Sequence, residues 1–326
     1  MDKTPISIII DDPAPIMSVY YAHRSSDFTD DGRPIIEYVS NEFLVAFCDI
    51  AEKYNIKGKF SVVPMPGNRG DIVNGIPGVP YEQIAAWLDI VRCRIMPGFA
   101  VGPEMLTHHK AVDLETGAAL AMDERVWSRT QNRSTLIPYI SKALSLLRDV
   151  SIEACGVTSP WDFGIEVEDE YVAAISQAVW DVNSQGTAWY FLRGLHHRAN
   201  AKPWLAYDEN GRCVVSIPAT TSDHFWQTIN SARTDDEYIS SLADALITED
   251  GGAGEIITVL ETGGWPILLT HWQSLVSNGL GTGLRALEET ARRIAKNVSG
   301  QVEWKSFLEI MDTVAANKSL YPKPQF

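Results

Sequence analysis

Two adjacent carboxylates, Asp11 and Asp12, follow the short β-branched run 6–10. Neighbouring carboxylates repel each other, so the pair favours a cation or a shared proton close by. If one of them binds a metal ion, the other is left as a base beside it. The alternative interpretation is a solvated turn, because Asp-Asp-Pro commonly opens a turn.

A second group of ionisable residues lies between Glu104 and Asp113. Glu104 and His108 are four residues apart, as are His109 and Asp113. In a helix this spacing puts both side chains of a pair on one face. Imidazole and carboxylate together suit Zn²⁺ or a similar divalent ion. The alternative is a polar loop with one structural histidine.

Three further segments place polar groups beside aromatic rings or after an apolar run. His271 ends the run 266–270, where an imidazole can act as general acid or base near neutral pH. Trp161 stands next to Asp162, and Trp226 closes the polar–aromatic segment 223–226. Each also has a plain structural interpretation, as a core histidine or as a tryptophan that packs in a turn.

Strand-like runs alternate with helical patterns, which predicts an α/β protein with a mostly parallel sheet. In such folds the loops at the carboxyl ends of the strands form the site. Four such loops would bring together Asp11–Asp12, His108–His109, 159–162 and His271. Strands are expected at 6–10, 58–64, 153–158, 188–192 and 266–270, and helices at 37–54, 134–147, 168–182, 234–247 and 280–298.

The composition excludes several classes of partner. The 326 residues include 27 Lys and Arg against 42 Asp and Glu, a net charge of −15. Nucleic-acid binders need clustered basic residues, and an acidic chain gains nothing from an anionic membrane surface. No signal peptide or membrane-spanning run is recognisable, so we expect a cytoplasmic protein. A homo-oligomer is left open.

The order of these segments resembles the polysaccharide deacetylase family, also called the NodB homology or carbohydrate esterase family 4 domain. The family's first motif ends a strand in Asp-Asp, here Asp11-Asp12, and its last is Leu-x-x-His, here 268–271. Its second motif, His-Ser/Thr-x-x-His, is matched in spacing by His109 to Asp113, with His108 after Thr107 as the alternative first ligand. Its third motif, Arg-x-Pro-Tyr, resembles 158–161 without the arginine.

The resemblance covers about residues 6–308. It implies one domain over residues 1–326, an α/β fold of the incomplete (β/α)7 TIM-like barrel type, and one divalent metal, with Zn²⁺ as the expected ion. Asp11 would be the catalytic base and His271 the general acid. The metal ligands would come from Asp12, His108, His109 and Asp113, and the substrate contacts from Trp161, Asp162, Trp226 and Glu104.

The expected activity is metal-dependent removal of an acyl group from an N- or O-acetylated carbohydrate. Two alternatives stay open at this point. One is hydrolysis of a small amide or cyclic ureide on the same fold. The other is a degenerate, metal-free protein that binds carbohydrate, which the altered second and third motifs favour.

Overall fold

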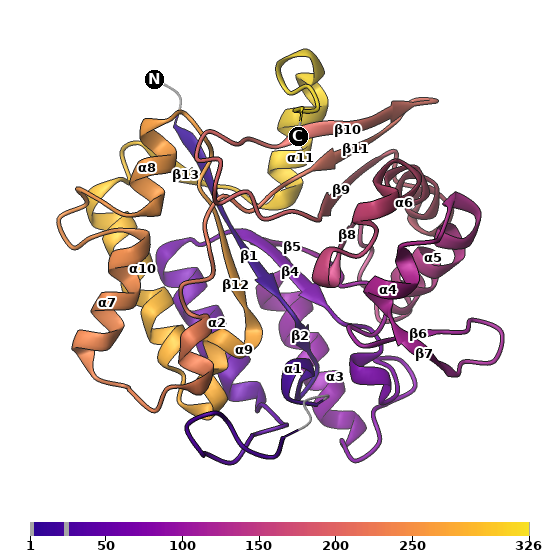
Figure 1. The fold of residues 1–326 in the computed structure, drawn as a ribbon, viewed down its shortest axis with the longest axis horizontal. Coiled ribbons are helices and arrows are strands. Elements are labelled where there is room, and N and C mark those ends of the chain that lie inside the picture. Colours follow the sequence, from indigo (N-terminus) through magenta and orange to yellow (C-terminus); the bar gives the residue numbers. More distant parts are fainter. Residues whose placement is uncertain (1–2, 23–25, 326) are drawn as a thin grey trace.

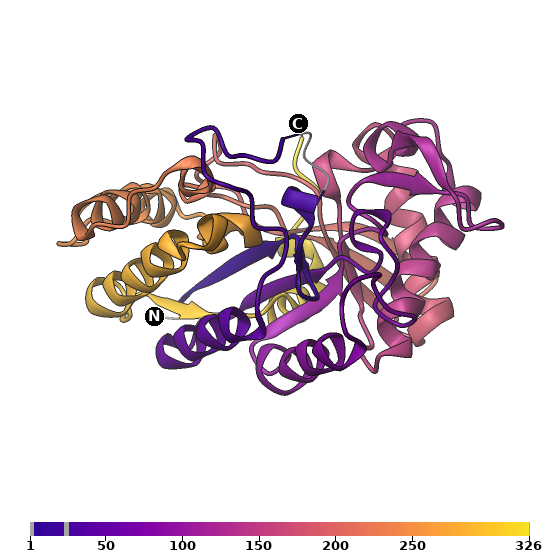
Figure 2. The same cartoon turned by 90° about the horizontal axis from the view of Figure 1, so that it is seen from below.

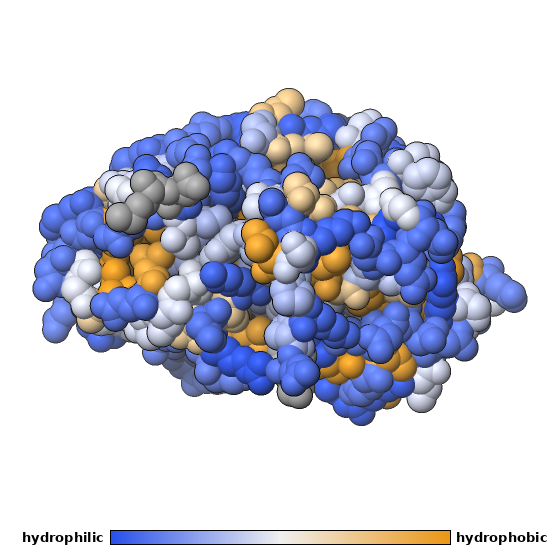
Figure 3. All heavy atoms as spheres, turned by 90° about the horizontal axis from the view of Figure 1, so that it is seen from above, coloured by the Kyte–Doolittle hydropathy of each residue, from blue (hydrophilic) through white to orange (hydrophobic). Residues whose placement is uncertain are grey.

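The computed structural model describes residues 3–22 and 26–325. Strands lie at its centre and helices pack on both sides of them (Figure 1). This is a mixed α/β fold in which most strand pairs of the two main sheets are parallel, as the alternation of strand and helix patterns predicts. Seen from above, hydrophilic residues cover most of the surface and hydrophobic residues lie in separate areas (Figure 3).

The larger sheet is built around β1 (Thr4–Asp11). Parallel to β1 run β12 (Ile267–His271), β4 (Gly58–Val62) and, at its beginning, β13 (Val302–Trp304). β5 (Phe99–Pro103) extends the sheet beyond β4. The run of buried residues from Ile6 to Asp11 is typical of a parallel strand covered on both faces. In this register Asp11 lies opposite His271.

The second sheet has the order β10 (Trp204–Glu209), β11 (Arg212–Ser216), β9 (Thr187–Phe191) and β8 (Gly156–Thr158). β10 and β11 form an antiparallel hairpin, and the other pairs are parallel. Residues that follow the strands link the two sheets at two places. A parallel bridge joins Glu104 to Thr158, and the Thr220 amide donates to the Ile267 carbonyl over 2.9 Å.

Most helices follow strands and cover their outer faces, as a second view shows (Figure 2). α2 (Asn41–Tyr54) begins after Ser40 and buries Leu44, Phe47 and Ala51 at the spacing expected for one helix face. The other helices are α1 (Val19–Ala22), α3 (Tyr81–Ile90), α4 (Glu124–Ser128), α5 (Arg133–Asp149), α6 (Glu168–Asn183), α7 (Asp236–Leu246), α8 (Glu255–Glu261), α9 (Trp272–Val276), α10 (Thr282–Asn297) and α11 (Phe307–Ala316).

Two short antiparallel hairpins complete the described chain. β2 (Pro13–Ala14) pairs with β3 (Met17–Ser18) directly after β1. β6 (Lys110–Val112) pairs with β7 (Ala119–Asp123), and β7 leads into α4. The sequence patterns do not predict β5 or the β6–β7 hairpin, because these segments show no clear alternation of apolar and polar residues.

Candidate metal centre

The carboxyl ends of the parallel strands open into a cavity of about 660 Å³. Asp11 and His271 are the last residues of β1 and β12, and Glu104 follows β5. Eight of the ten residues predicted from the sequence line this cavity: Asp11, Asp12, Glu104, His108, Trp161, Asp162, Trp226 and His271. The structure therefore brings together residues that are far apart in the chain.

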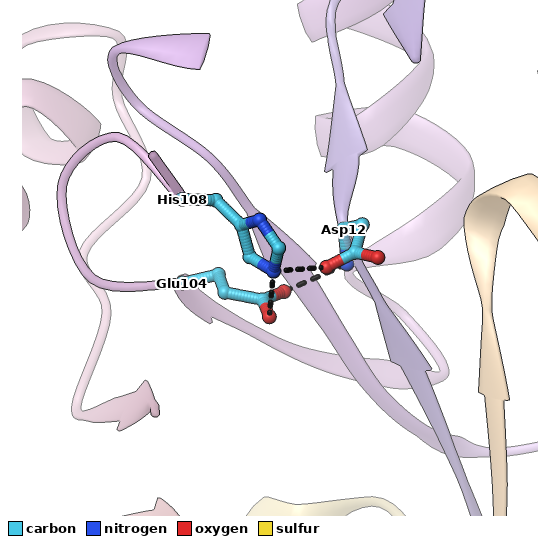
Figure 4. A group of neighbouring side chains, drawn as sticks. All are labelled: Asp12, Glu104 and His108. Carbon is cyan, nitrogen blue, oxygen red and sulfur yellow. Dashed lines mark hydrogen bonds and ion pairs between the residues drawn. The ribbon is translucent and has the colours of Figure 1, made fainter. Parts of the chain in front are cut away.

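Asp12, Glu104 and His108 point toward one another in the wall of the cavity (Figure 4). His108 Nε2 lies 2.9 Å from Asp12 Oδ1 and 3.6 Å from Glu104 Oε1. Each of the three offers one ligand atom, and these atoms all lie within 4.8 Å of one another. All three residues are buried. Two carboxylates and one imidazole form a donor set suited to a divalent cation.

Backbone geometry and hydrogen bonds orient the two carboxylates. Asp12 adopts a left-handed conformation with φ 70°, which turns it out of the β1 strand. Its amide donates to Glu104 Oε2 over 2.7 Å, and the Gln273 amide group donates to Asp12 Oδ2. These contacts link three segments of the chain and preorganise the carboxylates.

The carboxylates of this group repel one another, which favours a cation among them. Burial and the nearby carboxylates of Asp11 and Asp12 raise the pKa of Glu104 well above its usual value. Burial opposes ionisation of Asp12 as well, but the charge and the hydrogen bond of His108 outweigh it and lower the pKa of Asp12. Asp11, Asp12 and Glu104 are thus crowded together beside the cationic groups of Lys59, His108 and His271. A divalent ion between Asp12 and Glu104 would relieve the repulsion between carboxylates that raises the pKa of Glu104.

Asp11 is held by a buried ion pair. The fully buried Lys59 ammonium donates to Asp11 Oδ1 and, over 2.7 Å, to the Thr158 hydroxyl. The Ser61 hydroxyl also contacts Asp11 Oδ1, at 3.3 Å. Lys59, from β4, is therefore the cation that joins Asp11 at the end of β1 to Thr158 at the end of β8. The role of Asp11 as a base stays a prediction.

Replacement of Lys59 by Met is expected to lower the free energy of unfolding by about 3–5 kcal/mol, because it leaves the buried Asp11 charge uncompensated. Chemical denaturation at pH 7 measures the change. Lys53→Met is the matched control, since the Lys53–Glu288 pair is exposed to solvent and such surface pairs contribute little to stability. Equal losses in both variants would contradict this account of the ion pair.

His271, at the end of the strand beside β1, is paired with Asp223. Its Nδ1 lies 2.8 Å from Asp223 Oδ2, which also accepts the Ser274 hydroxyl over 2.7 Å. Burial alone would lower the pKa of His271. The hydrogen bond to Asp223 and the negative charge of Asp12 outweigh burial and raise this pKa to about 9. His271 is thus protonated at neutral pH, as a general acid must be.

In protein freed of metal with a chelator, the His271 imidazole is expected to stay protonated through neutral pH and to lose its proton near pH 9. Because the Asp223 carboxylate favours the imidazolium, Asp223→Asn should move this titration toward the ordinary value of about 6.5. Nuclear magnetic resonance of labelled histidines measures both. A His271 signal that titrates near 6.5 in the unaltered protein would refute the pairing.

Two tryptophans border the cavity and are partly exposed. Trp161 is 43% exposed, and its ring centroid lies 4.3 Å from that of His108. Trp226 is 40% exposed and packs edge-on against His271 at 5.0 Å. Trp161 and Asp162 both have positive φ, in the 3-10 turn after β8. The two rings therefore frame the space between the histidines.

His109 and Asp113 do not join the candidate ligands, which corrects the expectation for these two residues. The i, i+4 argument assumes a helix, but residues 110–112 form strand β6. Asp113 is only half-buried, and its Oδ1 accepts the amides of Glu115 and Thr116 in the hairpin turn. His109 lines a different cavity, of about 470 Å³. Glu104, predicted as a substrate contact, lies in the ligand group instead.

Sequence reasoning missed three residues of the site, Lys59, Asp223 and Gln273. A lysine inside the largely apolar strand 58–64 is a signal that could have been used, because a charge in a buried strand needs a partner. Asp223 belongs to the same polar–aromatic segment as Trp226. Gln273 carries no local signal, since its partner Asp12 is 261 residues away.

Comparison with known proteins gives little further guidance. No protein-family model matches this chain, and no curated protein is significantly similar to it. Among solved structures, the 4-alpha-glucanotransferase of Thermococcus litoralis is similar with a TM-score of 0.42 and 14% sequence identity. The match covers 94% of this chain and 40% of that enzyme. Within residues 3–22 and 26–325, no helix has the length and apolar character needed to span a membrane.

Proposed function

We propose that this protein is a metal-dependent hydrolase that removes an acyl group from an N- or O-acetylated carbohydrate. The observation that carries the proposal is the buried Asp12–Glu104–His108 group beside the His271–Asp223 pair in one cavity. The proposal includes the finer fold, an incomplete (β/α)7 barrel. The contacts of Glu104 with Thr158 and of Thr220 with Ile267 support a ring of strands.

Asp12, Glu104 and His108 would hold the cation, for which Zn²⁺ is the expected ion. The chemistry supplied by such an ion is Lewis acidity, which polarises an acyl carbonyl and makes water more acidic. The lowered pKa of Asp12 makes a negative oxygen available to a cation at neutral pH. His108 would bind through Nε2 as a neutral imidazole, so the cation would replace the proton that His108 shares with Asp12. Gln273 fixes the other oxygen of Asp12 and so fixes its orientation.

His271 would donate a proton to the leaving nitrogen or oxygen of the substrate. Asp223 orients the imidazole through Nδ1, which leaves Nε2 for this transfer. Asp11 would take the proton from water through Oδ2, because Lys59 and Ser61 engage Oδ1. Trp161 and Trp226 would flank a sugar ring with their exposed faces.

Elemental analysis of protein purified without chelator, followed by a substrate screen, tests the proposal. We expect about one divalent ion per chain. The screen should include N- and O-acetylated sugars, small linear amides and cyclic ureides. Release of acetate supports deacetylation, whereas turnover of small amides alone would keep the site and change the substrate class. A protein with no metal and no uptake on addition would favour a binding function.

A further inference from the structure

Glu124, the first residue of α4, makes unusual contacts with the loop that carries the candidate ligands. It is fully buried and lies outside the cavity lining. Its Oε1 accepts the amides of Leu106 and Thr107 over 3.1 and 3.0 Å, and its Oε2 accepts the His108 amide over 2.8 Å. The Tyr139 hydroxyl donates to Oε1 over 2.7 Å. One carboxylate thus receives four hydrogen bonds, three of them from consecutive backbone amides.

The backbone of this loop needs such support. Met105 and His108 both have positive φ, 33° and 50°, a conformation that non-glycine residues keep only where their surroundings impose it. Consecutive amides that converge on one point form a site for an anion. Here the anion is built into the chain, and hydrogen bonds to an ionised acceptor are stronger than neutral ones.

The contacts also connect the β6–β7 hairpin to the ligand loop in both directions. The Glu124 amide donates to the His109 carbonyl over 2.9 Å, while the Glu124 carboxylate accepts from the residues before His109. Lys110 and Asp123 pair across the hairpin and bring Glu124 back to the loop. The hairpin therefore brings Glu124 back beside the backbone of His108.

We propose that Glu124 is a positioning residue of the cation site, which holds the loop from Glu104 to His108 so that His108 Nε2 faces Asp12 and Glu104. This inference rests on the proposed cation site and deepens it. Glu124 does not touch the cation or the substrate. It acts through the amide of His108, whose side chain lies 2.9 Å from Asp12.

Glu124→Gln is the informative variant, because it keeps the shape of the side chain and removes one acceptor oxygen. Either the His108 amide or the group formed by Leu106, Thr107 and Tyr139 then faces an NH₂ instead of an oxygen. We expect Zn²⁺ affinity, measured by calorimetry on the full chain, to fall about 10–100-fold, the usual cost of losing an outer partner of a metal ligand. The visible spectrum of the protein saturated with Co²⁺ should change as well.

Glu168→Gln is the matched control. Glu168 also accepts a buried tyrosine hydroxyl, that of Tyr190 over 2.8 Å, and pairs with Arg193, but it does not contact the ligand loop. It should leave both the Zn²⁺ affinity and the Co²⁺ spectrum unchanged. If Glu124→Gln fails to fold, Tyr139→Phe removes one donor to Glu124 and should give a smaller loss of affinity in the same direction.

Amide hydrogen exchange tests the positioning itself without a metal. The amides of Leu106, Thr107 and His108 should be protected in the unaltered chain, exchange faster in Glu124→Gln and stay protected in Glu168→Gln. Unchanged exchange together with unchanged Zn²⁺ affinity in Glu124→Gln overturns this inference and leaves the proposed function intact. An unaltered chain that binds neither Zn²⁺ nor Co²⁺ overturns the cation site, and the positioning role with it.

Discussion

Asp12→Ala is expected to abolish stoichiometric binding of a divalent metal. Asp12 contributes the carboxylate nearest to His108 Nε2, at 2.9 Å, and it is the carboxylate kept ionised by its surroundings. Loss of a direct ligand should lower the metal affinity by more than the roughly 10–100-fold that loss of an outer partner costs. Elemental analysis after dialysis measures metal content, and calorimetry with Zn²⁺ measures the affinity.

Asp113→Ala is the control that separates the sequence-based ligand set from the structural one. Asp113 was predicted as a ligand, but it lies in the exposed turn of the β6–β7 hairpin. Asp113→Ala should therefore keep its metal, whereas Glu104→Ala and His108→Ala should lose it. Metal that persists in Asp12→Ala and disappears in Asp113→Ala would mean that the ligand set described above is wrong.

His271→Ala is expected to lower kcat by about 10²–10⁴-fold on the substrate that the screen identifies, the usual contribution of a general acid. The loss should fall mainly on kcat, because His271 would act in the transition state rather than in ground-state binding. The metal content should stay unchanged, since His271 is not among the three grouped ligands. Steady-state kinetics and elemental analysis measure the two effects.

His197→Ala provides the matched control for His271, because His197 is an exposed histidine outside the cavity lining. It should retain full activity. The kcat of Asp223→Asn should lie between those of His271→Ala and His197→Ala, since this variant keeps the imidazole and removes the carboxylate that orients it. Full activity in His271→Ala would remove this residue from the proposed mechanism while leaving the cation site untouched.

Much of the architecture could be predicted from local patterns. β1, β4, β9 and β12 coincide with apolar runs, and α5, α6, α7 and α10 coincide with helical spacing. β5 was not predicted as a strand by range, and the i, i+4 spacing of Glu104 and His108 suggested a helix. The structure has a loop there, yet it still brings the two side chains within 3.6 Å. The spacing therefore predicted correctly that the two side chains lie close together, although the backbone between them is not helical.

The sequence by itself determined which residues stand at strand ends. Asp11–Asp12 and His271 each follow a run apolar enough to be buried in a parallel sheet, so their place at one edge follows from composition and period alone. The excess of acidic residues is likewise a property of composition. For these features the physical cause is local, because burial and strand period act over a few neighbouring residues.

Only the tertiary structure decided which of these groups interact. Lys59 with Asp11, Asp223 with His271 and Gln273 with Asp12 are pairs separated by 48, 48 and 261 residues. Such pairs depend on sheet register and on loop conformations with positive φ, which no local period encodes. The same holds for the exclusion of Asp113 and the role assigned to Glu124. A buried charge pairs with whichever group lies beside it in the folded chain. The electrostatics of the site therefore depend on how the strands assemble.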